Sequence, residues 1–515
     1  MSTFTQDNPT EIIATRNLTM FWGQDTIRVT PRLTLTLGAR YEPYTHWHAW
    51  KGMQDILAPG QQSTTYPNLP PGILTEGDAG VPKNGINNDW NRVGPRVGVA
   101  FDPFGDGKTS IRGGYGIFYD VFSATTIHEN SSAPPFATDV SIYEPASFAN
   151  PYLGVSDPFP APIPVSPTNP INRPVATVWA VPKNMVPPEI QQWNFTLERQ
   201  LPHNLLVRAG YVGSHGLDIT RNVIPNAAVY IPGTNAQGHP LSTLANVNSR
   251  RPFPGYQTIN SSRADGISNP DSLLITVERR LARGLEIKVN YTLSKSLDDA
   301  PQTSGDPHQD QLRNPLGNPS MYGLSDFDRT HYFVGSLIYQ IPTPFAQTRL
   351  ARYTLGGWEL TSIGNIESGA PFTVSSAGDP SLSAGGPVYA DYIGGCNVHH
   401  RPAGVSPMQA WFNTSCFQNA AIGTFGNLRR NTLRGPGFRN LESGLYRKFT
   451  ITERVNLMFR AEFYNILNHP NFTSPGSGLG SLASFGKITG TAGGLYGLGT
   501  TSDPRVIQFA LRLGF

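Results

Sequence analysis

The sequence contains no long apolar segment. No run within its 515 residues reaches the roughly 20 apolar residues that a membrane-spanning helix requires. Charged residues make up 15%, well below the roughly 25% of an ordinary globular protein, and the net charge of +3 gives no reason to expect nucleic acid as a partner. The first sixteen residues are polar and lack the basic start and apolar stretch of a signal peptide.

Glycine (53 residues) and proline (46 residues) are both abundant, without the strict period of collagen. This composition predicts many turns and long irregular loops. The hydrophobic fraction of 38% would give a soluble domain of this length a thin core. A barrel with a water-filled interior needs only one apolar face per strand and tolerates such a composition.

Only two cysteines occur, Cys396 and Cys416, within one loop-like stretch. We expect them to form a disulfide that staples an exposed loop in an oxidising compartment. Two unrelated free thiols are the alternative. His399 and His400 lie close by, but zinc motifs usually contain closely spaced ligand pairs, so a metal site is not expected here.

Several segments alternate between apolar and polar residues with period two, which is typical of a strand with two different faces. Over residues 285–294, one face carries Leu285, Ile287, Val289, Tyr291 and Leu293, and the other carries Glu286, Lys288, Asn290, Thr292 and Ser294. Residues 33–42, 193–198 and 455–463 alternate in the same way. The chain is therefore predicted to be all-β, although a soluble sandwich would also alternate.

Strand and loop lengths favour an antiparallel transmembrane β-barrel. The expected strands are about 10 to 14 residues long, whereas soluble strands are mostly 5 to 6. Aromatic residues gather at strand ends, as at Tyr41, Tyr44 and Trp47, where an aromatic girdle would place them; ordinary core aromatics are the alternative. Short turns alternate with long connections, roughly at residues 48–91, 122–189, 215–270, 298–326, 371–436 and 468–503.

We expect about thirteen strands, at residues 17–30, 33–47, 92–103, 109–121, 190–201, 205–214, 271–282, 285–297, 328–341, 357–370, 437–450, 454–467 and 505–515. The first and the last of them would run in the same direction, so they cannot close an antiparallel barrel against each other. Either one strand has been missed or the chain lacks N-terminal strands, and the missing signal peptide favours the second explanation.

The last strand resembles the signal by which outer-membrane barrels are recognised for assembly. Its apolar face, ending on an aromatic residue, consists of Ile507, Phe509, Leu511, Leu513 and Phe515.

Nearly the whole chain resembles the barrel of TonB-dependent outer-membrane receptors, most closely the Oar-like branch with its N-terminal carboxypeptidase-regulatory-like domain. The resemblance rests on ordered segments such as "LTLTLGARYEPY" (33–44), "NRVGPRVGVAFDPFGDGKTSIRGGYGIFYD" (91–120) and "RGPGFRNLESGLYRKFTITERVNLMFRAEFYNILNHPNF" (434–472). Such receptors have a signal peptide, a plug domain, a TonB-contact segment and 22 strands. Residues 17–515 would then be the C-terminal part of the barrel, after a polar segment at 1–16.

This resemblance implies energy-coupled uptake of a nutrient across the outer membrane of a Gram-negative cell. The implied partners are outer-membrane lipid, the barrel-assembly machinery, an extracellular ligand that the sequence does not identify, and the TonB complex through the missing N-terminal region. A passive porin or adhesin barrel and a secreted β-rich binding protein remain alternatives. A propeller would need repeats of about 40 to 50 residues, and none is visible.

Charged residues on the polar strand faces set the orientation of the barrel. Facing lipid, each basic residue would cost about 2 to 4 kcal/mol at the membrane midplane. We therefore expect the polar face to line the lumen, with charged residues at Arg40, Glu198, Arg208, Glu286, Lys288, Glu359, Arg460 and Glu462.

No catalytic constellation or cofactor motif is apparent. Ser214, His215 and Asp218 are close in sequence, but a triad is defined by its spatial geometry. His46 and His48, and the group Asp306, His308 and Asp310, are better explained as interfacial, loop or turn residues than as metal ligands. The sequence therefore predicts neither an enzyme nor a metal site.

Overall fold

The computed structural model describes most of the chain and is almost entirely β-structure. The described residues are 3–7, 13–49, 52–67, 69–122, 135–136, 139–143, 147, 149–153, 176–300, 321–342, 348, 353–386, 388–401, 403–492 and 504–515. Within them, no helix is long and apolar enough to cross a membrane.

Thirteen long strands form one sheet, here called the wall, in which each strand pairs antiparallel with the wall strand before and after it. This confirms the predicted all-β architecture and its number of wall strands. The strands are β3 (Phe21–Thr30), β4 (Leu33–Tyr41), β8 (Val93–Phe101), β9 (Thr109–Tyr119), β12 (Glu189–Leu201), β13 (Leu205–Val223), β14 (Tyr256–Ala282), β15 (Leu285–Asp298), β17 (His331–Gln340), β18 (Trp358–Glu367), β23 (Phe438–Thr450), β24 (Asn456–Tyr464) and β25 (Val506–Gly514).

The register of the wall keeps apolar residues on one face and polar residues on the other. Val277 of β14 pairs with Val289 of β15, and the next pair is Thr276 with Asn290. Successive strand residues point to opposite faces, so one face presents aliphatic side chains and the other presents hydrogen-bonding groups.

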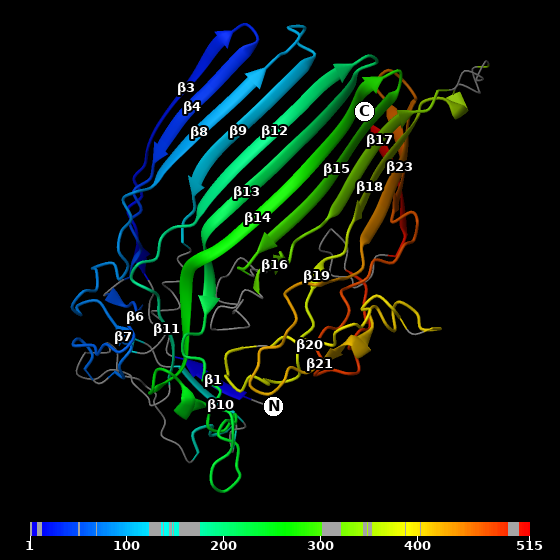
Figure 1. Cartoon of the computed structure of the whole chain (residues 1–515). Helices are drawn as coiled ribbons and strands as arrows, with labels where there is room; N and C mark the ends of the chain where they lie inside the picture. The colour runs from blue at the N-terminus through cyan, green and yellow to red at the C-terminus, as the bar shows by residue number, and fades with distance from the viewer. Residues whose placement is uncertain are drawn as a thin grey trace.

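The connections separate into two ends of the wall. Short turns join most of the strands at one end, where the connection between β17 and β18 is the longer exception. Arg283 and Gly284 (φ 52° and 77°) have the left-handed conformations that a two-residue hairpin turn requires. The long connections gather at the other end, at the bottom of Figure 1. We call the described residues of these connections, together with those that precede β3, the cap.

The cap is folded, which corrects the expectation of irregular loops. It contains the 3₁₀ turns Val247–Arg250 and Thr414–Cys416 and the short strands β1 (Thr3–Asp7), β2 (Ala14–Thr15), β5 (His48–Ala49), β6 (Ile56–Leu57), β7 (Ile73–Leu74), β10 (Asp139–Tyr143), β11 (Ala176–Trp179), β16 (Gly323–Leu324), β19 (Pro371–Phe372), β20 (Asp391–Tyr392), β21 (Phe417–Gln418) and β22 (Leu433–Arg434). β11 pairs with β14 and β16 with β15, which attaches the cap to the wall.

Most buried apolar side chains of the described residues lie in the cap rather than in the wall. The largest cluster packs Phe412, Phe417 and Phe485 around the buried Cys416. A second cluster contains Ile56, Leu74 and Val181. Burial of aliphatic and aromatic surface is worth about 25 cal/mol per Å², so these clusters stabilise the cap as folded lobes.

Three predicted strand boundaries were wrong by six residues or more. β13 extends to Val223 and β14 begins at Tyr256, within the expected loop at 215–270, because backbone pairing beyond the apolar slab requires no hydrophobic alternation. Pro270, which lies within β14, has no paired residue on the neighbouring strand β13. β4 ends at Tyr41 instead of residue 47, and Tyr44 (3% exposed) packs in the cap instead of an aromatic girdle.

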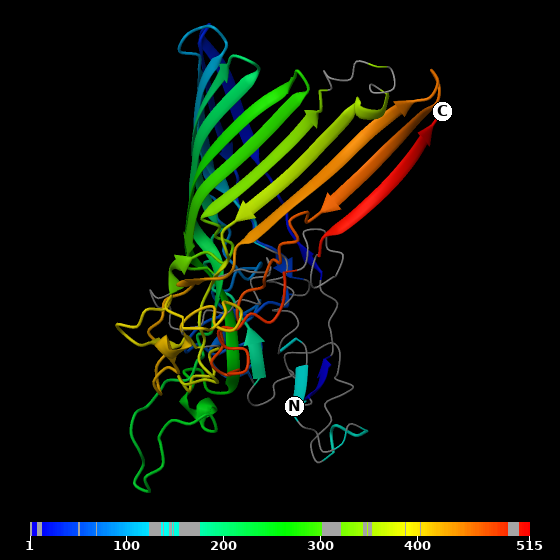
Figure 2. The same cartoon turned by 90° about the vertical axis from the view of Figure 1, so that its right-hand side faces the viewer.

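The wall is an open sheet with β3 and β25 at its two edges. Figure 2 shows the sheet bending with these two strands apart. Each follows the cap and leads away from it, so both run in the same direction, and closure into an antiparallel barrel requires an odd number of further strands.

We expect that these 515 residues, given a signal sequence and expressed in a Gram-negative host, do not form a closed barrel alone. In gel electrophoresis of the outer-membrane fraction, boiled and unboiled samples should migrate equally. A faster band in the unboiled lane would show a closed, detergent-resistant barrel and would contradict the strand parity.

Candidate functional site

Charged groups on the polar face of the wall pair with one another. Arg208 of β13 contacts Glu198 of β12 at 2.5 Å. On β24, Arg460 contacts Glu462, and the hydroxyl of Tyr446 donates to Glu462 at 3.1 Å. These pairs leave a hydrogen-bonding surface rather than an apolar core on this face.

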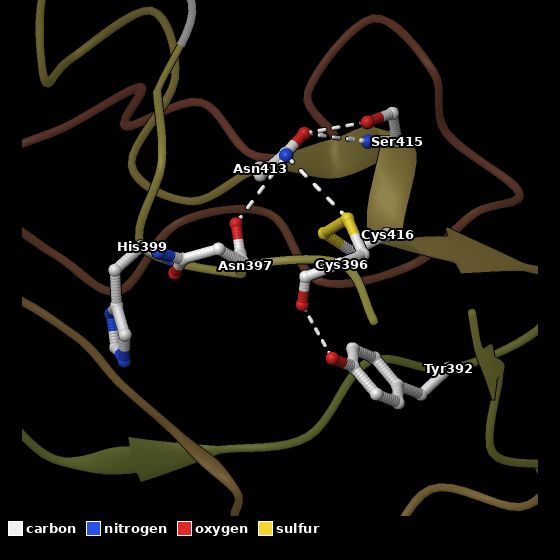
Figure 3. Close-up of a disulfide and its surroundings, with 7 residues drawn as sticks. All are labelled: Tyr392, Cys396, Asn397, His399, Asn413, Ser415 and Cys416. Atoms are coloured by element: carbon white, nitrogen blue, oxygen red, sulfur yellow. Dashed lines mark hydrogen bonds between the residues drawn. A yellow bond between two sulfur atoms is a disulfide. The ribbon is translucent and has the colours of Figure 1, made fainter. Parts of the chain in front are cut away.

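The disulfide Cys396–Cys416 closes a segment of the cap, and its two Cα atoms are 5.4 Å apart. Figure 3 shows Asn413 beside it, with the amide donating to Cys396 Sγ at 3.6 Å and to the carbonyl of Asn397 at 3.4 Å. The hydroxyl of Tyr392 donates to the carbonyl of Cys396. The ring of His399 points away from both sulfur atoms, so the geometry is that of a structural staple and not of a metal ligand set (Figure 3).

Replacing both cysteines with serine (Cys396→Ser, Cys416→Ser) is expected to destabilise this lobe by about 3 kcal/mol, because a link across 20 residues restricts the unfolded chain. Protease digestion of the cap under non-reducing conditions should become faster in the double variant. Cutting at the same rate as in the parent would contradict a stabilising link.

An ion-pair network that the sequence did not predict joins the cap to the wall. Arg430, whose side chain is 3% exposed, contacts Asp298 at the end of β15 and Asp326 at 2.7 Å. Asn431 donates to the other oxygen of Asp326 at 2.6 Å, and Arg434 pairs with the fully buried Asp328. We call these six residues the clasp. The sequence signal was the gathering of charges at 325–329 and 429–434.

The residues of the expected assembly signal lie on and just after β25 at the open edge. Ile507, Phe509, Leu511 and Leu513 share its apolar face and are 47 to 70% exposed, and Phe515 is 92% exposed. The structure therefore presents them as one accessible apolar stripe.

Those catalytic and metal candidates that lie in the described part of the chain are not assembled into a site. Ser214 and His215 are consecutive strand residues and point to opposite faces, and His215 Nδ1 lies 2.6 Å from Asn269 Oδ1. His46 is buried, which lowers its pKa to about 4, while His48 lies 3.4 Å from Glu76. Asp306, His308 and Asp310 lie outside the described residues. Within the described ranges, no group of three or more His, Cys, Asp or Glu could hold a metal ion.

A family model described as "outer membrane beta barrel domain" matches residues 1–508. The chain belongs to this outer-membrane β-barrel family. It is thus an outer-membrane protein and not an enzyme; its apolar face meets lipid and its polar face lines the lumen. By the general plan of such barrels, the short turns face the periplasm and the cap faces the outside.

Solved outer-membrane proteins resemble this barrel chain at low identity. The transporter YddB from Escherichia coli is 10% identical over 96% of this chain and 44% of its own, with a TM-score of 0.46. The siderophore receptor PiuA from Acinetobacter baumannii is 11% identical over 98% of this chain and 43% of its own, with a TM-score of 0.43. The FrpB iron transporter from Neisseria meningitidis (F3-3 variant) is 11% identical over 96% of this chain and 46% of its own, with a TM-score of 0.41. The chain spans less than half of each, and no curated protein matches it.

The cap of this outer-membrane barrel contains a buried carboxyl group, Asp55, which is 0% exposed, and neither of its carboxyl oxygens has a hydrogen-bond partner among the described residues. Burial raises its pKa well above the ordinary value. The folded cap therefore binds this proton more tightly than the unfolded chain does. The resulting stability is fully present below the unfolded pKa of about 3.9 and is lost as the pH rises through the folded pKa.

We expect the cap of the parent protein to lose up to about 1.4 kcal/mol of stability per pH unit in that window. Asp55→Asn should flatten this dependence because the amide does not ionise. Thermal unfolding followed from pH 4 to 9 measures it, with Glu453→Gln in an exposed periplasmic turn as control. Parallel profiles for Asp55→Asn and the parent would refute the assignment.

Proposed function

We propose that this chain is the barrel wall of a receptor for energy-coupled nutrient uptake. The observation that carries the proposal is the folded cap at the outer end of a polar lumenal wall, clamped to it by the buried Arg430–Asp298 pair. A receptor needs such a fixed outer surface to bind its ligand, whereas a passive pore needs only an open mouth. The ordered sequence segments described above point to the TonB-dependent, Oar-like receptors in particular.

We further propose that residues 17–515 are the C-terminal part of the barrel domain and 1–16 a polar segment before it. The parallel directions of β3 and β25 support this, because strands from elsewhere must join them. A plug domain and a TonB-contact segment would belong to the same receptor.

We assign the apolar stripe Ile507, Phe509, Leu511, Leu513 and Phe515 to recognition by the barrel-assembly machinery. Its exposure at the open edge of the sheet supports this role.

The test uses the complete reading frame that contains this sequence, expressed in a Gram-negative host. Uptake of radiolabelled nutrients from a defined mixture is compared in cells with and without a functional TonB, and after collapse of the proton gradient. Accumulation that requires both TonB and the gradient is expected. Uptake that is independent of both would instead identify a passive porin.

A further inference from the structure

A pocket opens on the lumenal side of the wall, directly beneath the cap. Its strand residues come from β14, β15, β17 and β18, and the turn before β17 closes one side. The side chains that matter below are Ser272, Thr292, Tyr332, Glu367, Phe327 and Arg329. In register, Ser272 and Thr292 belong to the same polar face as Asn290, so the pocket looks into the lumen.

The pocket presents hydroxyl groups that the protein leaves free. In the described part of the chain, the hydroxyls of Ser272, Thr292 and Tyr332 make no hydrogen bond, whereas that of Ser294 donates to the carbonyl of Arg329 at 2.6 Å. Free hydroxyls that converge in a concave site donate to and accept from a ligand with many hydroxyls of its own.

An aromatic ring stands beside these hydroxyls. Phe327 is 66% exposed, although it sits on a turn that is firmly held. Asp328 accepts from the backbone N–H of Ser296 at 2.7 Å, and the hydroxyls of Ser296 and Ser325 are 2.7 Å apart. A large apolar side chain kept in water on a rigid support is a feature of binding surfaces rather than of cores.

The charges around the pocket balance. Arg329 lies 3.8 Å from Glu367, and Asp328 is paired with Arg434. Lys295 and Asp271 also border the pocket, but they pair in register with each other on the same face as Val277 and Val289, so their side chains lie on the other side of the wall. The charges on the lumenal side are therefore paired and do not favour an anion or a cation, and the Arg329 guanidinium and the Glu367 carboxylate serve as a donor and an acceptor.

We propose that this pocket binds a neutral saccharide. The C–H face of a sugar ring would stack on Phe327, and its hydroxyls would bond to Ser272, Thr292, Tyr332, Glu367 and Arg329. This inference rests on the proposed function, since it names the class of ligand that the uptake lumen receives.

The test measures binding by calorimetry with the complete protein solubilised from outer membranes. The probes are maltohexaose, cellohexaose and xylohexaose, and the peptide hexaalanine. At least one saccharide should bind, Phe327→Ala should weaken that binding at least tenfold, and Ser272→Ala with Thr292→Ala should also weaken it. Phe104→Ala serves as the matched control, because Phe104 is 61% exposed in a periplasmic turn.

The proposal is overturned if no saccharide binds, if Phe327→Ala binds as the parent does, or if only hexaalanine binds. Heat-modifiability on gels verifies that each variant is folded. Binding in detergent needs neither TonB nor a gradient, so intact binding without coupled uptake would refute only the proposed function. Coupled uptake without saccharide binding would refute only the saccharide site.

Discussion

Val289→Arg is expected to prevent assembly of the barrel in the outer membrane. Val289 lies in the middle of β15 between Val277 and Gly335, on the face that meets lipid. An arginine placed there costs about 2 to 4 kcal/mol near the membrane midplane, a large share of the stability of a folded domain. The measurement is the amount of heat-modifiable protein in the outer-membrane fraction, using the complete reading frame.

Asn290→Arg is the matched control for this substitution. It introduces the same side chain one residue later on the same strand, but on the lumenal face between Thr276 and Val334. It should assemble as the parent does, and Lys288→Ala should do so as well. If both arginine variants assembled equally well, or both failed, the assignment of the two faces would be wrong.

Arg430→Ala is expected to release the cap from the wall at a cost of about 3 to 5 kcal/mol, because the substitution leaves the buried carboxylate of Asp298 without its partner. Asp326 loses its guanidinium contact at the same time. In intact cells that express the complete reading frame, limited proteolysis should then cut the segment 371–436 far faster than in the parent, while the heat-modifiable barrel persists.

Arg429→Ala provides the control, because Arg429 is the preceding residue and is exposed. Its digestion rate should match the parent. Arg430→Lys should restore part of the protection against proteolysis. Its ammonium group keeps the positive charge but cannot contact Asp298 and Asp326 at the same time, as the guanidinium does. Equal digestion of the Arg429→Ala and Arg430→Ala variants would show that the clasp does not hold the cap.

The wall could be predicted from the sequence because each of its strands carries its own signal. In a strand such as 285–298, one face contacts lipid and the other contacts water, so apolar and polar residues must alternate along its sequence. The outer parts of β13 and β14 carry no such signal, since strands in water can be polar on both faces. Their pairing depends on a partner strand that the local sequence does not reveal.

The cap and the clasp could not be predicted, because their contacts join residues far apart in the chain. Arg430 and Asp298 are 132 residues apart. Tyr44 had the sequence context of a girdle aromatic, yet it packs against Phe122 in the cap. By contrast, the two cysteines had no other candidate partner in the sequence, and the structure joins them.

In this barrel, β15 crosses the membrane with one side in lipid and the other in an aqueous lumen. Spin labels placed singly at residues 285–294 of the complete reading frame, in the Cys396→Ser, Cys416→Ser background, report this directly in outer membranes. We predict that labels at Ile287, Val289 and Tyr291 collide mainly with dissolved oxygen, and labels at Lys288, Asn290 and Thr292 mainly with a water-soluble nickel chelate. Accessibility that does not alternate along the strand would contradict the account.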